Sequence, residues 1–266
     1  MSTPDEELAA RLAQGAGHVL LDVRAAGADL TTAALKDAGD AAAHAYLVAE
    51  LARVRPDDAV LSEEGADDPV RLGAERVWIV DPLDGTREFS EHDEDGVWRS
   101  DWAVHVALWQ RGTGLTAGAV ALPGRDVVYT TDLRPARAAS SGGPLRLAVS
   151  RSRPPELIGA IAALTDVELV PMGSAGVKAM SVVTGECDAY VHGGGQYEWD
   201  SAAPVAVARA AGLHCSRLDG TPLEYNRPDP WLPDLVVCEA DRADDLLDLI
   251  SRAMRATAPA KENAAP

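Results

Sequence analysis

The chain has 266 residues, enough for one large domain or two modest ones with a substantial core. Its 47% hydrophobic and 25% charged residues are typical of a globular protein. The formal net charge of -18 disfavours binding to nucleic-acid polymers or anionic membranes, because so acidic a surface repels both. If the substrate is itself an anion, a bound cation is the simplest way to reverse the local field.

Three further classes of protein are disfavoured. No apolar run approaches the roughly 18 to 20 residues that a membrane-spanning helix needs. The acidic segment Met1–Glu7 lacks the basic start of a signal peptide. Cys187, Cys215 and Cys238 are isolated and odd in number, which argues against a disulfide framework and a cysteine metal site. We therefore expect a cytoplasmic protein.

The first half of the chain begins with helical patterns and continues as strands. Apolar spacing predicts helices over 6–26 and 40–55, followed by strands at 59–61 and 77–80. Three strands separated by Arg-Gly-Thr-Gly and Pro-Gly-Arg turns are then expected at 103–109, 115–122 and 126–131. The small-residue stretch 134–144 is a candidate boundary, which predicts an α+β half over 1–140.

The second half alternates between strands and helices. We expect strands at 145–149, 189–192 and 234–238, and helices at 155–164, 175–184, 201–211 and 241–256. This alternation predicts an α/β half over 141–266, with a frayed end from residue 257.

The segment Asp81-Pro82-Leu83-Asp84-Gly85-Thr86 follows the apolar strand 77–80 directly. A carboxylate at the C-terminal end of such a strand points into the crevice where α/β folds bind ligands. Two converging carboxylates repel each other unless a proton or cation intervenes, and Mg²⁺ prefers such oxygen ligands. The alternative is ordinary turn chemistry, because Asp-Pro and Asp-Gly are common in turns.

Other acidic residues add weaker signals. Glu63 and Glu64 follow the strand 59–61, where an exposed loop is the alternative. Asp200 lies where a helix begins, so it is either a metal ligand or a plain N-cap. Residues 56–101 hold 15 acidic residues against four arginines, and we interpret the part 91–95 as a solvated surface loop. Whether 90–101 covers a pocket stays open.

Together these segments resemble a known family. Asp81–Thr86, followed by Trp199-Asp200-Ser201-Ala202-Ala203, is similar to the paired signatures of the inositol monophosphatase superfamily of Mg²⁺-dependent, lithium-sensitive phosphatases. Glu63-Glu64 and 101–108 also fit, and the resemblance covers most of 40–240. The run Arg87-Glu88-Phe89 and the motif Glu224–Arg227 resemble the CysQ-type 3′(2′),5′-bisphosphate nucleotidases within that superfamily.

The resemblance implies a fold, a metal site and an assembly. The fold would be the layered αβαβα sugar-phosphatase architecture, and the protein would be a homodimer. Two or three Mg²⁺ ions would bind each active site. Glu63, Asp81 and the Leu83 carbonyl would hold one of them, and Asp81, Asp84 and Asp200 a second.

The resemblance also implies catalytic and substrate-binding roles. The catalytic group would comprise Glu63, Thr86 and an acid near the start of the second helix that orients the attacking water with Thr86. The family places that acid in a Thr-x-Ala-Asp motif, but this chain lacks the threonine. The register favours Asp40, and Asp37 is the rival. Substrate contacts would come from a larger set, namely Glu63, Leu83, Asp84, Gly85, Thr86, Arg151, Ser174, Lys178 and Asp200.

Several of the substrate contacts have alternatives. Arg151 suits a second phosphate through bidentate contacts, or it belongs to a surface loop. Ser174 and Lys178 lie in a segment similar to the family's Gly-Ser-x-x-Lys. Tyr225 and Arg227 are candidates to flank an adenine ring. The six histidines show no ligand spacing, so we expect each to be solvated or structural.

The resulting hypothesis is an enzyme that removes the 3′-phosphate of 3′-phosphoadenosine 5′-phosphate, a by-product of sulfate assimilation. Metal-activated water would carry out the in-line displacement. The nearest alternatives are phosphatases for inositol 1-phosphate or fructose 1,6-bisphosphate. A non-catalytic metal- or nucleotide-binding protein is the alternative from another class.

Overall fold

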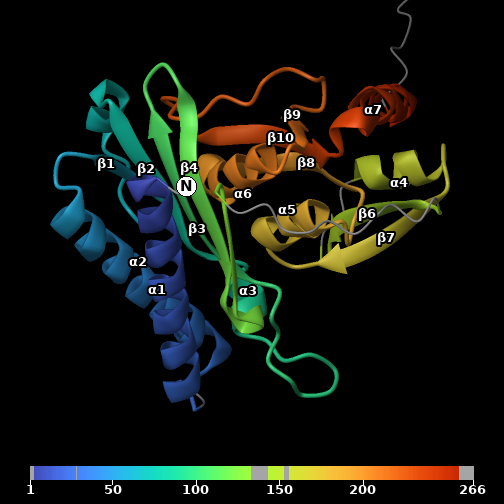
Figure 1. Ribbon diagram of the computed structural model, residues 1–266. Helices are drawn as coiled ribbons and strands as arrows, with labels where there is room; N and C mark the ends of the chain where they lie inside the picture. Colours follow the sequence, from blue (N-terminus) through green and yellow to red (C-terminus); the bar gives the residue numbers. More distant parts are fainter. Residues whose placement is uncertain (1–2, 28, 133–142, 153–155, 258–266) are drawn as a thin grey trace, which may run out of the picture.

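A computed structural model of the chain describes residues 3–27, 29–132, 143–152 and 156–257. Its elements form five layers, in the order two helices, a sheet, two helices, a second sheet and two helices (Figure 1). The layered αβαβα architecture predicted from the sequence is therefore confirmed. The candidate boundary at 134–144 lies largely outside the described residues, so the division at residue 140 stays a prediction.

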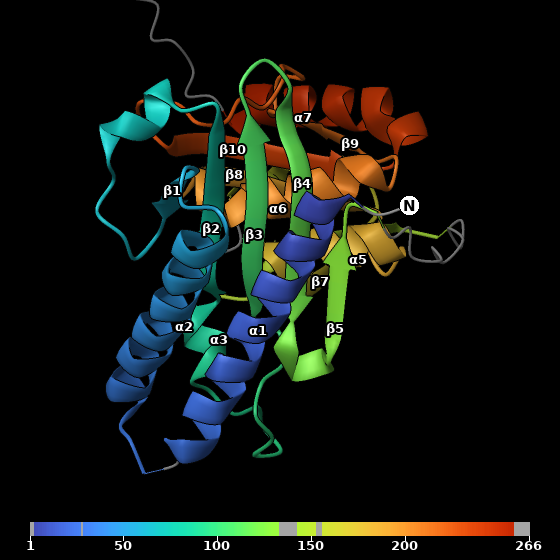
Figure 2. The ribbon, with the colours of Figure 1, turned by 60° about the vertical axis from the view of Figure 1, so that its left-hand side comes forward.

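The first sheet has the strand order β1-β2-β3-β4-β5. Its strands are β1 (Ala59–Ser62), β2 (Arg76–Asp84), β3 (Ala103–Gln110), β4 (Gly114–Leu122) and β5 (Val127–Thr130). β1 and β2 pair in parallel, and the remaining pairs are antiparallel. α1 (Pro4–Ala26) and α2 (Thr32–Val54) cover one face of this sheet (Figure 2).

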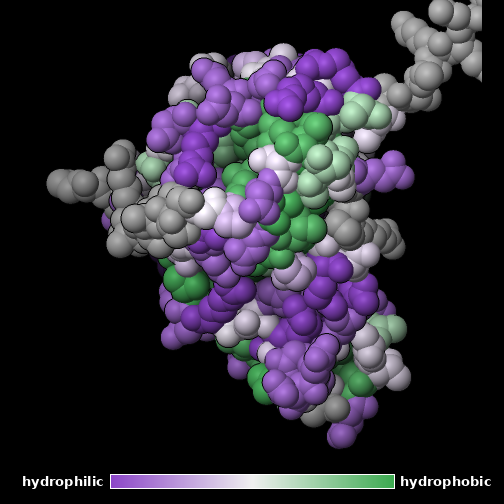
Figure 3. All heavy atoms as spheres, turned by 90° about the vertical axis from the view of Figure 1, so that its right-hand side faces the viewer, coloured by the Kyte–Doolittle hydropathy of each residue, from purple (hydrophilic) through white to green (hydrophobic). Residues whose placement is uncertain are grey.

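The second sheet has the order β7-β6-β8-β10-β9. Its strands are β6 (Leu145–Ser150), β7 (Val167–Met172), β8 (Ala189–Tyr197), β9 (His214–Ser216) and β10 (Trp231–Cys238). α5 (Ala175–Thr184) and α6 (Glu198–Ala210) lie between the two sheets, and α4 (Glu156–Ala162) and α7 (Ala243–Thr257) cover the outer face. β7 is an edge strand in which three of the six residues are exposed, and apolar side chains reach the surface on this side of the molecule (Figure 3).

Side-chain alternation in β2 explains why its sequence is apolar throughout. Val77 and Ile79 join the core between the sheets, whereas Trp78 and Val80 join the core under α1 and α2. Successive strand residues point to opposite faces, so a strand covered by helices on both sides needs apolar residues at every position. The strand that carries the acidic motif is thereby fixed on both faces.

The structure differs from the sequence prediction at several boundaries. α2 begins at Thr32 rather than at residue 40, and the Thr31 side chain caps it by accepting the Ala34 N–H. Asp40 is therefore inside the helix and is not its N-cap. β2 continues to Asp84, so both acids of the motif belong to the strand. β7 and β9 were not predicted, and β8 extends to Tyr197.

Gly39 explains the missed start of α2 and also positions Asp40. A helix-interior glycine lowers helix propensity, which weakens the pattern over residues 32–39. A Cβ on Gly39 would lie 2.8 Å from the Phe89 ring and 3.2 Å from Leu83. The missing side chain lets α2 approach the end of β2 and α3 (Thr86–Phe89) closely.

Gly39→Ala is expected to lower the free energy of unfolding by about 1–3 kcal/mol, because the added methyl group overpacks a buried ring. Gly159 is a matched control inside α4, where a Cβ would meet nothing within 4 Å. Gly159→Ala should raise stability by about 0.5–1 kcal/mol through helix propensity alone. Urea unfolding of both variants measures the difference, and a stabilised Gly39→Ala variant would contradict the close-approach argument.

Candidate active site

A β-bulge brings the two acids of the strand motif to one face of the first sheet. Asp81 pairs with His105 and Asp84 with Ala103, so β2 advances three residues while β3 advances two. In a regular strand, residues three apart point to opposite faces. The extra residue of the bulge reverses this, and both carboxylates face the layer of α5 and α6. The Asp81 carboxylate also accepts the Leu83 N–H at 3.0 Å.

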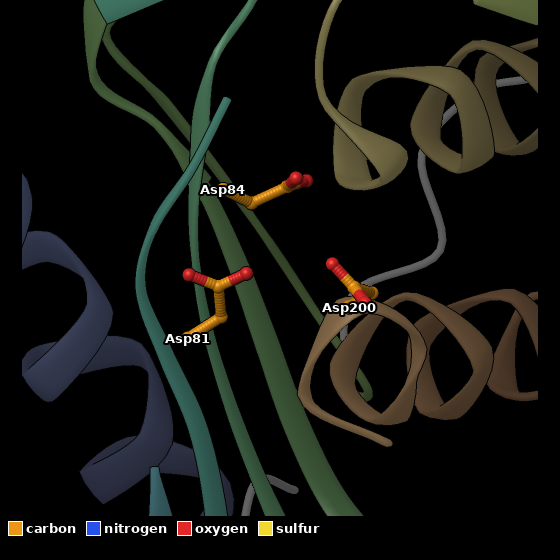
Figure 4. Close-up of side chains that lie close together, drawn as sticks. All are labelled: Asp81, Asp84 and Asp200. Carbon is orange, nitrogen blue, oxygen red and sulfur yellow. The ribbon is translucent and has the colours of Figure 1, made fainter. Parts of the chain in front are cut away.

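Asp200 approaches the same point from α6. It is the third residue of the helix, and its carboxylate accepts the Tyr197 N–H at 2.6 Å. Asp200 therefore caps the N-terminus of α6 from within its first turn. The same side chain faces the bulge in β2. Ligand atoms of Asp81, Asp84 and Asp200 all lie within 4.8 Å of one another, and Figure 4 shows the three side chains converging from β2 and α6.

Burial and mutual repulsion raise the pKa of three carboxyl groups around this point. Burial and the charges of Glu63, Asp84 and Asp200 raise the pKa of Asp81 well above its ordinary value. Burial and the charge of Asp84 raise the pKa of Asp200 to about 6. More than a third of the Glu63 surface is exposed, yet desolvation of its carboxyl group and the charge of Asp200 raise its pKa to about 7. The cluster thus holds more negative charge than it can keep ionised without a cation.

Asp84 behaves differently because it has cationic and donor partners. Burial raises the pKa of Asp84, but the charge of His105 and other favourable contacts bring it well below the ordinary value. His105 is fully buried, and its Nε2 lies 3.2 Å from the Asp84 carboxylate. At the start of α5, the Ser174 hydroxyl and the Gly176 N–H also donate to Asp84.

Gly85, Thr86 and Asp40 lie beside the bulge. Gly85 has a φ of +88°, which allows the sharp turn from β2 into α3. The Thr86 hydroxyl donates to the Leu83 carbonyl at 3.2 Å. Asp40 lies near Thr86, whose side chain partly opposes the rise in the Asp40 pKa. Burial and the charges of nearby Glu64 and Asp37 raise the pKa of Asp40 to about 7. Of the two rival acids, Asp40 is the one that reaches Thr86.

A pocket of about 680 Å³ opens beside the acidic cluster. Asp84, Asp200, Ser174 and Lys178 are among the residues that line it. Further lining residues come from α3 (Arg87 and Glu88), from the end of β6 and the turn after it (Ser150 and Ser152), from β8 (Tyr190 and the segment 192–197) and from the start of β10 (Trp231). This volume is typical of a small-molecule site.

Lys178 is the buried cation of the pocket. Its ammonium group donates to the Gly173 and Ser174 carbonyls at the start of α5. Burial lowers the pKa of Lys178, although the charge of Asp84 and other carboxylates opposes that shift. With Ser174, it combines a positive charge and a hydroxyl group in one wall of the pocket.

Other predicted contacts lie elsewhere. The Arg151 guanidinium is paired with Glu88 and Glu91 at 2.7 and 2.8 Å, and it does not line the pocket, whereas Arg87 does. Tyr225 is buried and hydrogen-bonded to Ser201, and it lines a different hollow. Neither Tyr225 nor Arg227 lines the pocket beside the acidic cluster, and their place beside an adenine ring stays a prediction. Residues 90–101, all described, are absent from the pocket lining, so this acidic loop does not form its wall.

His105 and the pocket wall of β8 were missed from the sequence. A single histidine within the apolar strand 103–109 was the available signal for His105, because alternation places it on the face opposite Val104 and Val106. His192 and the three glycines after it line the pocket from β8. Their composition was the only indication in the sequence that they line a pocket, because their position beside the pocket depends on how the second sheet packs.

The donor set fits a divalent cation. The buried oxygen Oδ2 of Asp81 has no hydrogen-bond partner among the described residues, although it lies within a cluster of carboxylates. A buried ionised oxygen without a partner is costly unless a cation or a proton compensates it. Carboxylate and carbonyl oxygens without nearby thiols suit a hard cation.

The chain belongs to the inositol monophosphatase family, which its residues 2–255 match. This is a family of metal-dependent phosphatases. Among curated relatives, the chain is 54% identical to a Mycobacterium leprae 3′-phosphoadenosine 5′-phosphate phosphatase, over 92% of this chain and 93% of the relative. It is 31% identical to the 3′(2′),5′-bisphosphate nucleotidase CysQ of Escherichia coli K12, over 84% and 94%.

The fold also matches solved structures. CysQ from Bacteroides thetaiotaomicron, a bacterial member of the inositol monophosphatase family, superposes with a TM-score of 0.73 at 28% identity, covering 88% of this chain and 97% of that one. Mycobacterium tuberculosis SuhB gives 0.69 at 25% identity, covering 93% and 96%. Within the described residues, no helix has both the length and the hydropathy needed to span a membrane.

Asp81→Asn is expected to stabilise the metal-free protein and to abolish its stabilisation by Mg²⁺. The folded-state pKa of Asp81 is raised above its ordinary 3.8, so folding at neutral pH either takes up a proton or keeps a repelled charge. This cost is absent below pH 3.8 and grows as the pH rises toward the folded-state pKa. Asparagine removes it, so the gain in melting temperature should be largest near pH 8, at about 2–4 °C per kcal/mol.

Thermal melts from pH 4 to pH 8, with chelator and then with Mg²⁺, measure both effects. Glu94→Gln is the control, because Glu94 is an exposed acid outside the pocket. It should change neither the metal-free melting temperature nor the Mg²⁺ response appreciably. A metal-free Asp81→Asn protein less stable than the wild type at pH 8 would contradict the repulsion argument.

Proposed function

We propose that this protein is a Mg²⁺-dependent phosphatase that removes the 3′-phosphate of 3′-phosphoadenosine 5′-phosphate and releases AMP and phosphate. The observation that carries the proposal is the convergence of Asp81, Asp84 and Asp200, two of which, Asp84 and Asp200, line a substrate-sized pocket. The 54% identity to a relative named for this reaction supports the choice of substrate.

The metal-binding residues are assigned as follows. Glu63, Asp81 and the Leu83 carbonyl would hold one Mg²⁺, and Asp81, Asp84 and Asp200 would hold a second. Magnesium bound there supplies water activation and compensates the charge of the phosphate oxygens. The pKa of Glu63 is raised to about 7, so a fraction of the protein carries a proton there at neutral pH, and cation binding would release it.

Thr86 and Asp40 would orient the attacking water. Thr86 Oγ1 is held by the Leu83 carbonyl, and Asp40 lies near it. The water oxygen bonds to phosphorus, the bond from phosphorus to O3′ breaks, and O3′ takes up a proton to give the ribose hydroxyl. An acid with a pKa of about 7 can exchange a proton near neutral pH, which suits Asp40 to this role.

The pocket wall would bind the rest of the substrate. Ser174 and Lys178 present a hydroxyl group and an ammonium group near the metal site, and Arg87 lies farther along the lining. These donors suit the phosphate groups of a bisphosphate. In the structure Arg151 is tied to Glu88 and Glu91, so its predicted contact with a second phosphate would require those ion pairs to open.

The remaining parts of the proposal rest on the resemblance to the family and on composition. They are inhibition by Li⁺, a homodimeric assembly, a cytoplasmic location and a role in recycling a by-product of sulfate assimilation. The net charge of -18 supports a small-molecule substrate rather than a nucleic-acid polymer or a membrane surface.

The deciding experiment measures phosphate release from three substrates at equal concentration, with and without Mg²⁺ and Li⁺. The substrates are 3′-phosphoadenosine 5′-phosphate, inositol 1-phosphate and fructose 1,6-bisphosphate. We expect a Mg²⁺-dependent, Li⁺-sensitive kcat/KM that favours the nucleotide at least tenfold, about 1.4 kcal/mol of transition-state discrimination. A preference for either other substrate would overturn the nucleotide assignment, and no release from any would overturn the phosphatase assignment.

Asp40→Asn is expected to lower kcat by about 100-fold while KM changes little, because it removes the proton-accepting group but keeps the packing. Asp37→Asn is the matched control one turn earlier on the same helix, where the side chain is exposed. It should keep near-normal kcat. Steady-state kinetics of both variants would reassign the acid if Asp37→Asn were the more impaired.

A further inference from the structure

Arg71 is a nearly fully buried arginine that lies outside the pocket. It belongs to the short helical turn Pro69–Gly73, which connects β1 to β2, and it is 1% exposed. Its guanidinium group forms a fork with the Asp67 carboxylate at 2.6 and 2.9 Å. Asp67 lies four residues after Glu63 in the same loop. Arg71 therefore anchors the loop that carries the most exposed of the proposed metal ligands.

The same guanidinium group reaches across to the second half of the chain. It donates to the Asn226 side-chain oxygen at 2.7 Å and to the Arg227 carbonyl at 2.9 Å. The Asn226 amide donates back to the Arg71 carbonyl at 3.3 Å. A single buried side chain thus connects the loop after β1 with the connection between β9 and β10.

Glu198 binds the connection between β9 and β10 from the side opposite Arg71. It is 0% exposed, and its two carboxylate oxygens accept the N–H groups of Asn226 and Arg227 at 2.6 and 2.7 Å. Glu198 is the first residue of α6, two positions before Asp200. The contacts therefore continue without a break from the Glu63 loop to the helical turn that presents Asp200.

The conformation of Asn226 shows that this connection is strongly constrained. Asn226 has a φ of +59°, a left-handed conformation that non-glycine residues rarely adopt. Five hydrogen bonds converge on Asn226 and Arg227 from Arg71 and Glu198, and they offset that strain. Burial raises the pKa of Glu198 to about 7, and the N–H groups of Asn226 and Arg227 and the charge of Arg71 oppose that rise.

We propose that Arg71 and Glu198 are positioning residues that set the spacing between Glu63 and Asp200. The set Asp67, Arg71, Glu198, Asn226 and Arg227 is named the Arg71 network. The proposal rests on the proposed function, because it assigns these residues to the Mg²⁺ site. Residues behind metal ligands commonly change metal affinity or activity by about 10–100-fold when they are altered. The Glu224–Arg227 motif thereby gains a role that does not involve contact with the substrate.

Arg71→Lys is the first test, because it keeps the charge but loses the planar fork. We expect the Mg²⁺ dissociation constant of the full-length protein, measured by calorimetry, to rise about tenfold. The Mg²⁺ concentration for half-maximal hydrolysis of 3′-phosphoadenosine 5′-phosphate should rise by the same factor. KM for the nucleotide at saturating Mg²⁺ should stay within about twofold of the wild type, since the network does not line the pocket.

Asn226→Gly is the second test, which keeps the proposal testable if Arg71→Lys fails to fold. Glycine adopts the left-handed conformation readily, which offsets part of the cost of losing the two side-chain hydrogen bonds to Arg71, so this variant should fold. It lacks the side chain that Arg71 holds, and its Mg²⁺ affinity should fall several-fold. A loss of Mg²⁺ affinity larger than that of a control variant with a similar melting temperature separates positioning from general stability.

Arg76→Lys is the matched control. Arg76 also forms ion pairs with two carboxylates, those of Asp58 and Asp5, but it lies at the far end of β2 from the bulge. This variant should lower the melting temperature and leave Mg²⁺ affinity unchanged. If Arg71→Lys behaves as Arg76→Lys does and Asn226→Gly binds Mg²⁺ like the wild type, the positioning role is overturned. A wild-type protein that binds no Mg²⁺ would overturn the proposed function itself.

Discussion

The repulsion among Asp81, Asp84 and Asp200 is the constraint around which the rest of the structure is arranged. Their ligand atoms lie within 4.8 Å of one another in a buried place, where like charges are costly. The protein offsets only part of this cost. His105 and the first turn of α5 keep Asp84 ionised, whereas the pKa of Asp81 stays raised and one of its oxygens accepts no hydrogen bond from the described residues. The uncompensated part is what makes the site attract a cation.

Close approach between elements makes this arrangement possible. A Cβ on Gly176 would lie 2.1 Å from the His105 ring, so glycine is needed for the start of α5 to reach Asp84. Gly39 has the same role in α2, where it brings Asp40 to Thr86. The bulge in β2 puts Asp81 and Asp84 on one face. These local irregularities do not stabilise a helix or a strand by themselves, and each places a functional group near the carboxylates.

The carboxylates and the layered fold could be predicted from the sequence. The geometry by which the carboxylates converge could not. Asp81 and Asp84 were visible because they end an apolar strand, and Asp200 because it lies in a recognisable motif. The bulge was not visible, because pairing with β3 decides it. His105 escaped notice because its importance depends on a cross-strand neighbour. That Tyr225 and Arg227 lie outside the pocket was not visible either, because it depends on burial and on contacts with Glu198 and Arg71, which are tertiary properties.

The proposed site takes residues from both halves of the chain, so the contacts between the two halves matter for its geometry. Four of the proposed groups, Asp40, Glu63, Asp81 and Asp84, come from the first sheet and its helix, whereas Asp200 and most of the pocket wall come from the second half. A change in the contacts between the two halves would alter the distance from Asp200 to the other acids, even where each half kept its own fold. The core between the sheets draws residues from both halves, and the Arg71 network adds directional hydrogen bonds at its edge. Apolar packing alone is non-directional, so directional bonds are what such a spacing requires.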